Sequence, residues 1–98
     1  PIVSVPYTVE INDIVMMLVQ HHPAEKLLHR GREQFDRLYE ESATIPRVMA
    51  ISVHPYISGV PHRIRYVEEL YRHVLGKPGV VHWTGEAIAD WFRGAATR

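Results

Sequence analysis

The sequence contains no cysteine, so a disulfide framework is excluded, and a zinc site would have to use histidine and carboxylate ligands. Lysine plus arginine and aspartate plus glutamate each number 11, so the chain lacks the positive charge that drives nucleic-acid binding. The longest apolar run, Ile14 to Val19, is far shorter than the ~20 residues of a membrane span, and the amino terminus lacks a signal-peptide pattern. We therefore expect a cytoplasmic protein with neither nucleic-acid nor membrane partners.

What is present is typical of one folded domain that spans residues 1–98. Hydrophobic residues make up 46% of the chain and charged residues 22%, which is ordinary for a globular protein. The chain begins with Pro1 and not with methionine. We expect either that an initiator methionine was removed or that these residues belong to a longer parent.

Residues 46–63 carry the strongest pattern in the chain. The apolar run Val48 to Val53 ends at His54 and is followed by a loop rich in proline and glycine. Apolar runs bounded in this way are typical of strands that are buried on both faces of a parallel sheet. Such folds place ligand-binding and catalytic groups at the carboxyl ends of their strands. His54 is therefore the first candidate for a functional residue, and a buried core histidine is the alternative.

The other patterns alternate between strands and helices. Ile2 to Val5 predicts a first strand and Val80 to Trp83 a third. Helical spacing or caps predict helices at about residues 14–19, 23–41, 61–75 and 84–94. The predicted class is α/β, with three parallel strands alternating with helices as part of a distorted (β/α) barrel. Because the crossovers would be right-handed, helices would cover one face of this sheet, and more strands would have to cover the other.

Polar residues crowd the loop from Tyr7 to Asp13. Either Asn12 or Asp13 would cap the helix at residues 14–19 by accepting a backbone N–H. The alternative is that one of them reaches into a site beside His54. Because the loop and His54 both follow the carboxyl ends of predicted parallel strands, we expect them at the same edge of the sheet.

Three blocks of sequence occur in a characteristic order. Residues 6–13 read Pro-Tyr-Thr-Val-Glu-Ile-Asn-Asp, residues 51–54 read Ile-Ser-Val-His with Gly-Val-Pro-His-Arg at 59–63, and residues 80–84 read Val-Val-His-Trp-Thr before Glu-Ala-Ile-Ala. In this order and spacing they resemble the polysaccharide deacetylases of the NodB-homology type. The first block is most similar to a loop of the metal-independent, allantoinase-like branch. The second resembles the family's last histidine motif, and the third its final strand and helix.

The resemblance implies that this chain is the carboxyl-terminal part of a distorted (β/α) barrel. Members of the family hydrolyse a carbon–nitrogen amide bond in N-acetylated sugars, or in cyclic ureides in the allantoinase-like branch. His54 would be the histidine that protonates the departing nitrogen, a task that suits imidazole because it titrates near neutral pH. The resemblance implies substrate contacts from Glu10, Asn12, Asp13, Tyr56 and Arg63.

The sequence also departs from the family. The catalytic aspartate and the Asp-His-His ligand set of metal-dependent members belong to earlier strands, and no matching segment is present. A divalent metal such as zinc would belong to the full family domain, with no ligands for it in this chain. Val60 stands where many relatives carry a basic residue, which leaves substrate contacts by that loop open. Five other histidines are expected to be structural or solvated: His21, His22, His29, His62 and His73.

Two main classes of function follow from these observations, and a purely structural interaction domain is a third alternative. The first is the terminal part of an amide-bond hydrolase, inactive as a fragment, with a small-molecule or N-acetylated sugar substrate. The second is a non-catalytic α/β module that dimerises and binds a ligand or a protein. In both, the uncovered sheet face predicts self-association or packing on a missing amino-terminal part.

Overall fold

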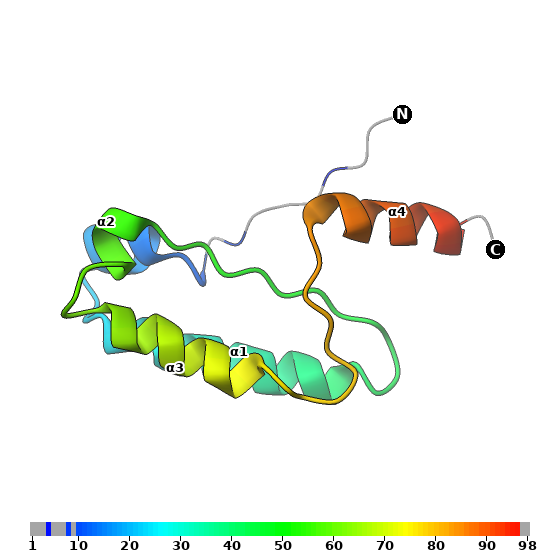
Figure 1. The fold of residues 1–98 in the computed structure, drawn as a ribbon, viewed down its shortest axis with the longest axis horizontal. Helices are drawn as coiled ribbons and strands as arrows, with labels where there is room; N and C mark the ends of the chain where they lie inside the picture. The colour runs from blue at the N-terminus through cyan, green and yellow to red at the C-terminus, as the bar shows by residue number, and fades with distance from the viewer. Residues whose placement is uncertain (1–3, 5–7, 9, 97–98) are drawn as a thin grey trace.

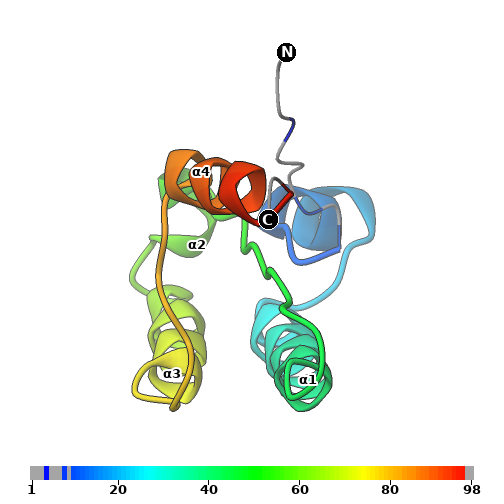
Figure 2. The same cartoon turned by 90° about the vertical axis from the view of Figure 1, so that its right-hand side faces the viewer.

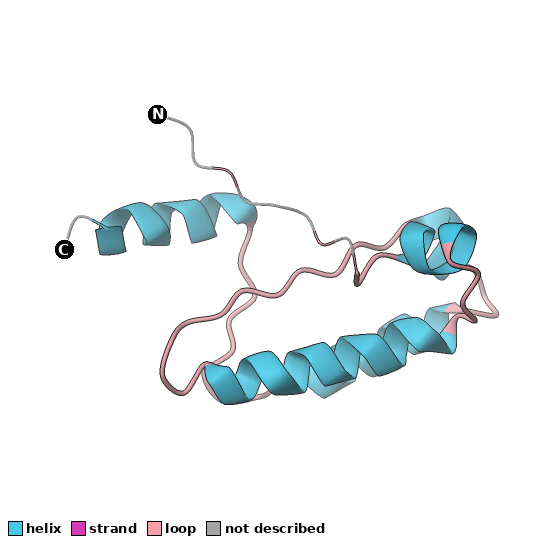
Figure 3. Ribbon diagram, turned by 180° about the vertical axis from the view of Figure 1, so that it is seen from behind, coloured by secondary structure: helices cyan, strands magenta, loops and turns pink. Residues whose placement is uncertain are grey.

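The computed structural model describes residues 4, 8 and 10–96 of the chain. Its elements, in order, are a π-helix η1 (Ile14–Val19) and four α-helices, α1 (Glu25–Glu41), α2 (Pro55–Ser58), α3 (Ile64–Val74) and α4 (Gly85–Ala96). Figure 3 shows the described chain as helices joined by loops. Within residues 10–96, the β-type pairing is an isolated parallel bridge between Asn12 and Ser52.

The predicted α/β class, with three parallel strands in part of a (β/α) barrel, is therefore wrong for the described residues. Val48 to Val53 runs as an extended loop whose side chains are all at least partly exposed; the side chain of Val48 is 58% exposed. Val80 to Trp83 is also a loop. Ile2 to Val5, the predicted first strand, lies almost entirely outside the described residues. Valine and isoleucine favour strands where neighbouring strands and a packed face are available. Among the described residues, this run pairs with another segment at one bridge, and most of its side chains face solvent at least in part.

The predicted helices are present, with one addition. The helix at residues 14–19 is of the π type, and α1, α3 and α4 occupy the other three predicted regions. Gly76, with φ of +78°, follows the end of α3 in the left-handed conformation expected of a residue beyond a helix C-cap. Thr84 Oγ1 accepts the backbone N–H of Ala87 at 3.1 Å and so caps α4 as predicted. The short helix α2 was not predicted.

The helices α1 and α3 pack side by side, as the view along their axes shows (Figure 2). Gly31 of α1 lies against Leu70 of α3, and a Cβ at Gly31 would be 2.6 Å from Leu70 Cδ2. The close approach at this glycine is therefore between two helices. The buried apolar side chains of the pair are Leu27, Leu28, Phe35, Leu70 and Val74. Figure 1 shows α4 apart from this pair.

A second apolar cluster connects the helix pair to the segments that carry the candidate site. Ile11, Met16 and Leu27 are buried together, and Ile51 packs against them. Burying each such side chain contributes about 1.5–3 kcal/mol. The cluster therefore anchors both the loop before η1 and the extended segment before His54 to α1. Within the described part of the chain, no helix has the length and apolar character needed to cross a membrane.

Candidate functional site

Two backbone hydrogen bonds bring the two halves of the candidate site together. The N–H of Ser52 donates to the carbonyl of Ile11 at 2.9 Å, and the N–H of Asp13 donates to the carbonyl of Ser52 at 3.1 Å. The two segments run parallel at this point. As a result, Asp13 lies beside His54, although 41 positions separate them in the sequence.

Asn12 supplies the cap at the start of η1. Its Oδ1 accepts the N–H groups of Ile14 at 3.1 Å and Val15 at 3.4 Å. The capping interpretation is therefore right for Asn12, and Asp13 makes no side-chain cap. Because Asn12 satisfies the first free N–H groups of the helix, the carboxylate of Asp13 is left for other partners.

The carboxylate of Asp13 is the centre of a buried polar cluster. Asp13 is 0% exposed, and its Oδ1 lies 2.7 Å from Nδ1 of His54. Its Oδ2 accepts the backbone N–H of His54 at 2.7 Å and the hydroxyl of Ser58 at 2.8 Å. Three donors on one buried carboxylate stabilise its charged form.

These contacts decide the ionisation of Asp13 and the ring nitrogen of His54 that donates to it. Burial raises the pKa of Asp13, but the side-chain and backbone hydrogen bonds from His54 and the hydrogen bond from Ser58, with the charge on His54, outweigh it and hold that pKa below its usual value. Because Asp13 is ionised at neutral pH, Nδ1 of His54 is the donor in their hydrogen bond. Nε2 is then the ring nitrogen left to exchange a proton with a bound molecule.

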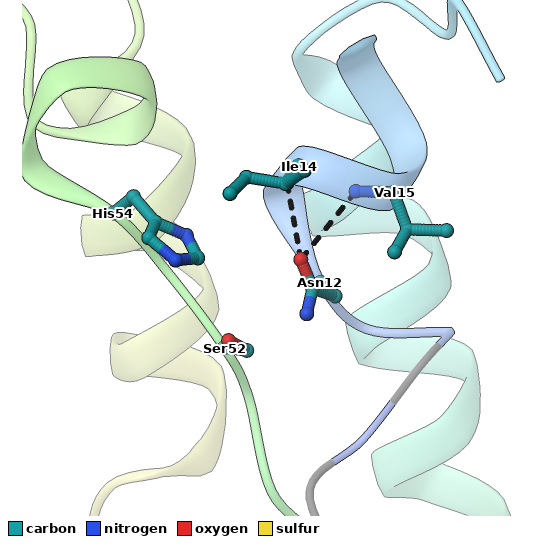
Figure 4. A pocket seen from close by; sticks show the side chains of 5 residues that line it. All are labelled: Asn12, Ile14, Val15, Ser52 and His54. Atoms are coloured by element: carbon teal, nitrogen blue, oxygen red, sulfur yellow. Dashed lines mark hydrogen bonds between the residues drawn. The ribbon is translucent and has the colours of Figure 1, made fainter. Parts of the chain in front are cut away.

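An open pocket of about 450 Å³ lies beside the imidazole. Figure 4 shows the His54 ring on one wall and the start of η1 on the other. The lining residues are Asn12, Ile14, Val15, Ser52 and His54. The lining therefore combines the apolar side chains of Ile14 and Val15 with polar groups from the other three residues, a combination that suits a small molecule with both apolar and polar groups.

The other residues predicted to contact substrate are placed differently. Tyr56 is 67% exposed, and its ring meets that of His54 edge to face at a centroid distance of 5.9 Å. Arg63 donates through Nη1 to the carbonyl of Ile57 at 2.8 Å, so it supports the loop after His54. Glu10 is exposed, and its backbone carbonyl accepts a hydrogen bond from Arg30. Their roles as substrate contacts stay predictions.

Sequence reasoning missed Ser58, the third member of the cluster. Ser58 is 2% exposed and lies at the end of α2, one helical turn after His54. The signal was available, because Pro55 follows His54 directly and proline is favoured at the first position of a helix. A helix from Pro55 would have placed Ser58 near the N-cap residue His54.

The cluster does not fit a metal ion. Both oxygens of Asp13 already have hydrogen-bond partners in His54 and Ser58. Across the part of the chain that the structure describes, no group of three or more histidine or carboxylate side chains could hold a metal ion.

Comparison with known proteins gives one relative of note. The chain is 35% identical over 88 residues to a protein of Schizosaccharomyces pombe named "Putative polysaccharide deacetylase". The match covers 88% of this chain and 28% of that protein, so the chain spans little more than a quarter of the length of its curated relative. No family model and no solved structure matches. The similarity supports the polysaccharide deacetylase resemblance at the level of the family name and does not distinguish the allantoinase-like branch.

Proposed function

We propose that this chain contributes the proton-donating part of a hydrolase that cleaves carbon–nitrogen amide bonds, of the polysaccharide deacetylase type. The observation that carries the proposal is the hydrogen bond between the buried carboxylate of Asp13 and Nδ1 of His54, at the side of an open pocket. The relative's name supports the same class of reaction. The substrate we propose is an N-acetylated sugar.

In this proposal His54 is the general acid. Asp13 holds the imidazole through Nδ1, which leaves Nε2–H as the group that would reach the substrate. When water has added to the amide carbon, the proton on Nε2 passes to the nitrogen, the carbon–nitrogen bond breaks, and the amine departs. His54 is then neutral. The group that activates the water would come from outside the described residues.

The likeness of residues 6–13 to the allantoinase-like branch suggests a second substrate class. A cyclic ureide also breaks a carbon–nitrogen bond at a nitrogen that needs a proton, so the same acid would serve. The two classes differ in size and shape, and a comparison of kcat/KM for an N-acetylated oligosaccharide and a cyclic ureide distinguishes them.

The test is the His54→Ala variant of the protein that carries these residues. We expect turnover of the preferred substrate to fall about 10²-fold or more, which is the usual contribution of a positioned general acid. Activity has to be expressed per folded molecule, with the melting curve measured alongside, because the variant also removes one partner of the buried Asp13.

His73→Ala is the matched control. Nε2 of His73 lies 2.6 Å from Oδ1 of Asp36, so this residue also forms a histidine–aspartate pair, but on the exposed seam between α1 and α3. We expect this variant to keep its turnover. Equal losses in both variants, or full activity in His54→Ala, would show that the acid is elsewhere.

A further inference from the structure

We propose that Ser58 is a positioning residue that keeps the Asp13 carboxylate ionised and turned toward the His54 ring. The effect of Ser58 on catalysis rests on the proposed function, in which His54 is the general acid. The inference adds a third residue to the site, and it predicts that the loss of the Ser58 hydroxyl changes the titration of Asp13.

The helix α2 places the hydroxyl of Ser58 directly against the carboxylate of Asp13. The hydroxyl of Ser58 is buried and donates to Oδ2 of Asp13 at 2.8 Å. The same oxygen accepts the backbone N–H of His54, so two donors hold Oδ2 and leave Oδ1 in line with Nδ1 of the ring. Two hydrogen bonds to one oxygen restrict the rotation of the carboxylate, and this favours the observed direction of its other oxygen.

The turn that carries Ser58 is itself held in place. The N–H of Ser58 donates to the carbonyl of His54 at 2.9 Å, and Arg63 donates to the carbonyl of Ile57 at 2.8 Å. Ser58 and His54 therefore belong to one hydrogen-bonded helical turn, so their positions are linked.

The groups that interact with the Asp13 carboxylate come from two residues, His54 and Ser58. Among the described residues, the titratable group that contacts its carboxylate is His54, and the remaining side-chain contact is the neutral hydroxyl of Ser58. The loss of that hydroxyl removes one of the bonds that favour the charged carboxylate, while burial continues to disfavour it. Asp13 would then take up a proton at a higher pH.

The experiment is a titration of the Asp13 side-chain carboxyl carbon by NMR in the wild type, Ser58→Ala and Ser58→Thr. We expect the midpoint to move to higher pH in Ser58→Ala and to stay near the wild-type value in Ser58→Thr, which keeps the hydroxyl. Ser42→Ala is the matched control, because Ser42 donates to the carbonyl of Tyr39 at the far end of α1 and makes no contact with Asp13. Ser58→Cys, which keeps the volume and is a weak donor, replaces Ser58→Ala if the latter fails to fold.

The outcomes separate this inference from the proposed function. An unchanged midpoint in Ser58→Ala or its replacement, or an equal rise in Ser42→Ala, overturns the role of Ser58. In an active protein we also expect turnover in Ser58→Ala to fall about tenfold with little change in KM, as for a lost hydrogen bond to a charged group. A wild type without hydrolase activity overturns the proposed function, whereas the titration of Asp13 still decides the inference on Ser58.

Discussion

Asp13 Oδ1 lies 2.7 Å from Nδ1 of His54, and the same aspartate accepts the backbone N–H of that histidine through Oδ2. The two residues belong to segments that a single parallel bridge holds together. Both the ring and the main chain of His54 are thus fixed by one buried carboxylate. This relationship allows predictions for the stability of the protein as well as for its chemistry.

The first prediction concerns acid stability. The pKa of Asp13 in the folded chain is below the value of about 3.9 for an unfolded aspartate, so its ionisation stabilises the fold above about pH 4. That stability is lost as the pH falls through the lower folded pKa. In Asp13→Asn we expect the free energy of unfolding near neutral pH to fall by about 1–3 kcal/mol, and its dependence on pH below about 4 to flatten.

Chemical denaturation at a series of pH values measures both effects. Asp36→Asn is the control, because Asp36 also pairs with a histidine but its side chain is 62% exposed. It should cost at most about 1 kcal/mol. If Asp13→Asn kept the acid slope of the wild type, Asp13 would not be the titrating group.

The second prediction concerns Gly59, which follows Ser58. A Cβ at this position would lie 2.6 Å from the carbonyl oxygen of Pro55 and 3.0 Å from its Cα, and these backbone atoms cannot move without distorting α2. We expect Gly59→Ala to lower the free energy of unfolding by about 1–3 kcal/mol and to weaken the Ser58 contact with Asp13. Thermal melts measure the change in melting temperature. Gly85→Ala is the control, because a Cβ at Gly85 would have no atom within 4 Å. Equal melting temperatures for the two variants would contradict the prediction.

The third prediction tests the packing of α1 on α3. A Cβ at Gly31 would lie 2.6 and 2.7 Å from the two δ carbons of Leu70, which is itself 1% exposed. We expect Gly31→Ala to destabilise the fold by about 1–3 kcal/mol, despite the better helix propensity of alanine. Gly94→Ala in α4, with nothing within 4 Å of the new Cβ, should instead stabilise it by about 0.5–1 kcal/mol. Urea denaturation measures the change in the free energy of unfolding for both variants. An increase in both would show that the Leu70 side chain moves aside for the new methyl group.

Several features of the protein could be predicted from the sequence by itself, because they depend on neighbours within one or two turns. Apolar spacing predicted the regions of α1 and α3, and Thr84 predicted the start of α4. Asn12 could be named as a cap because capping joins a side chain to N–H groups two and three residues away. His54 could be named as a candidate from the run and the proline around it.

The tertiary structure decided everything that depends on a partner far along the chain. The run before His54 has a strand-like composition, but it pairs with residue 12 at one bridge and forms no sheet among the described residues, because a strand exists only when other segments bond to it. The same reason explains why neither the contact of Asp13 with His54 nor that of Ser58 with Asp13 could be read from the sequence. The first spans 41 positions and the second 45, and no local pattern specifies contacts over such separations.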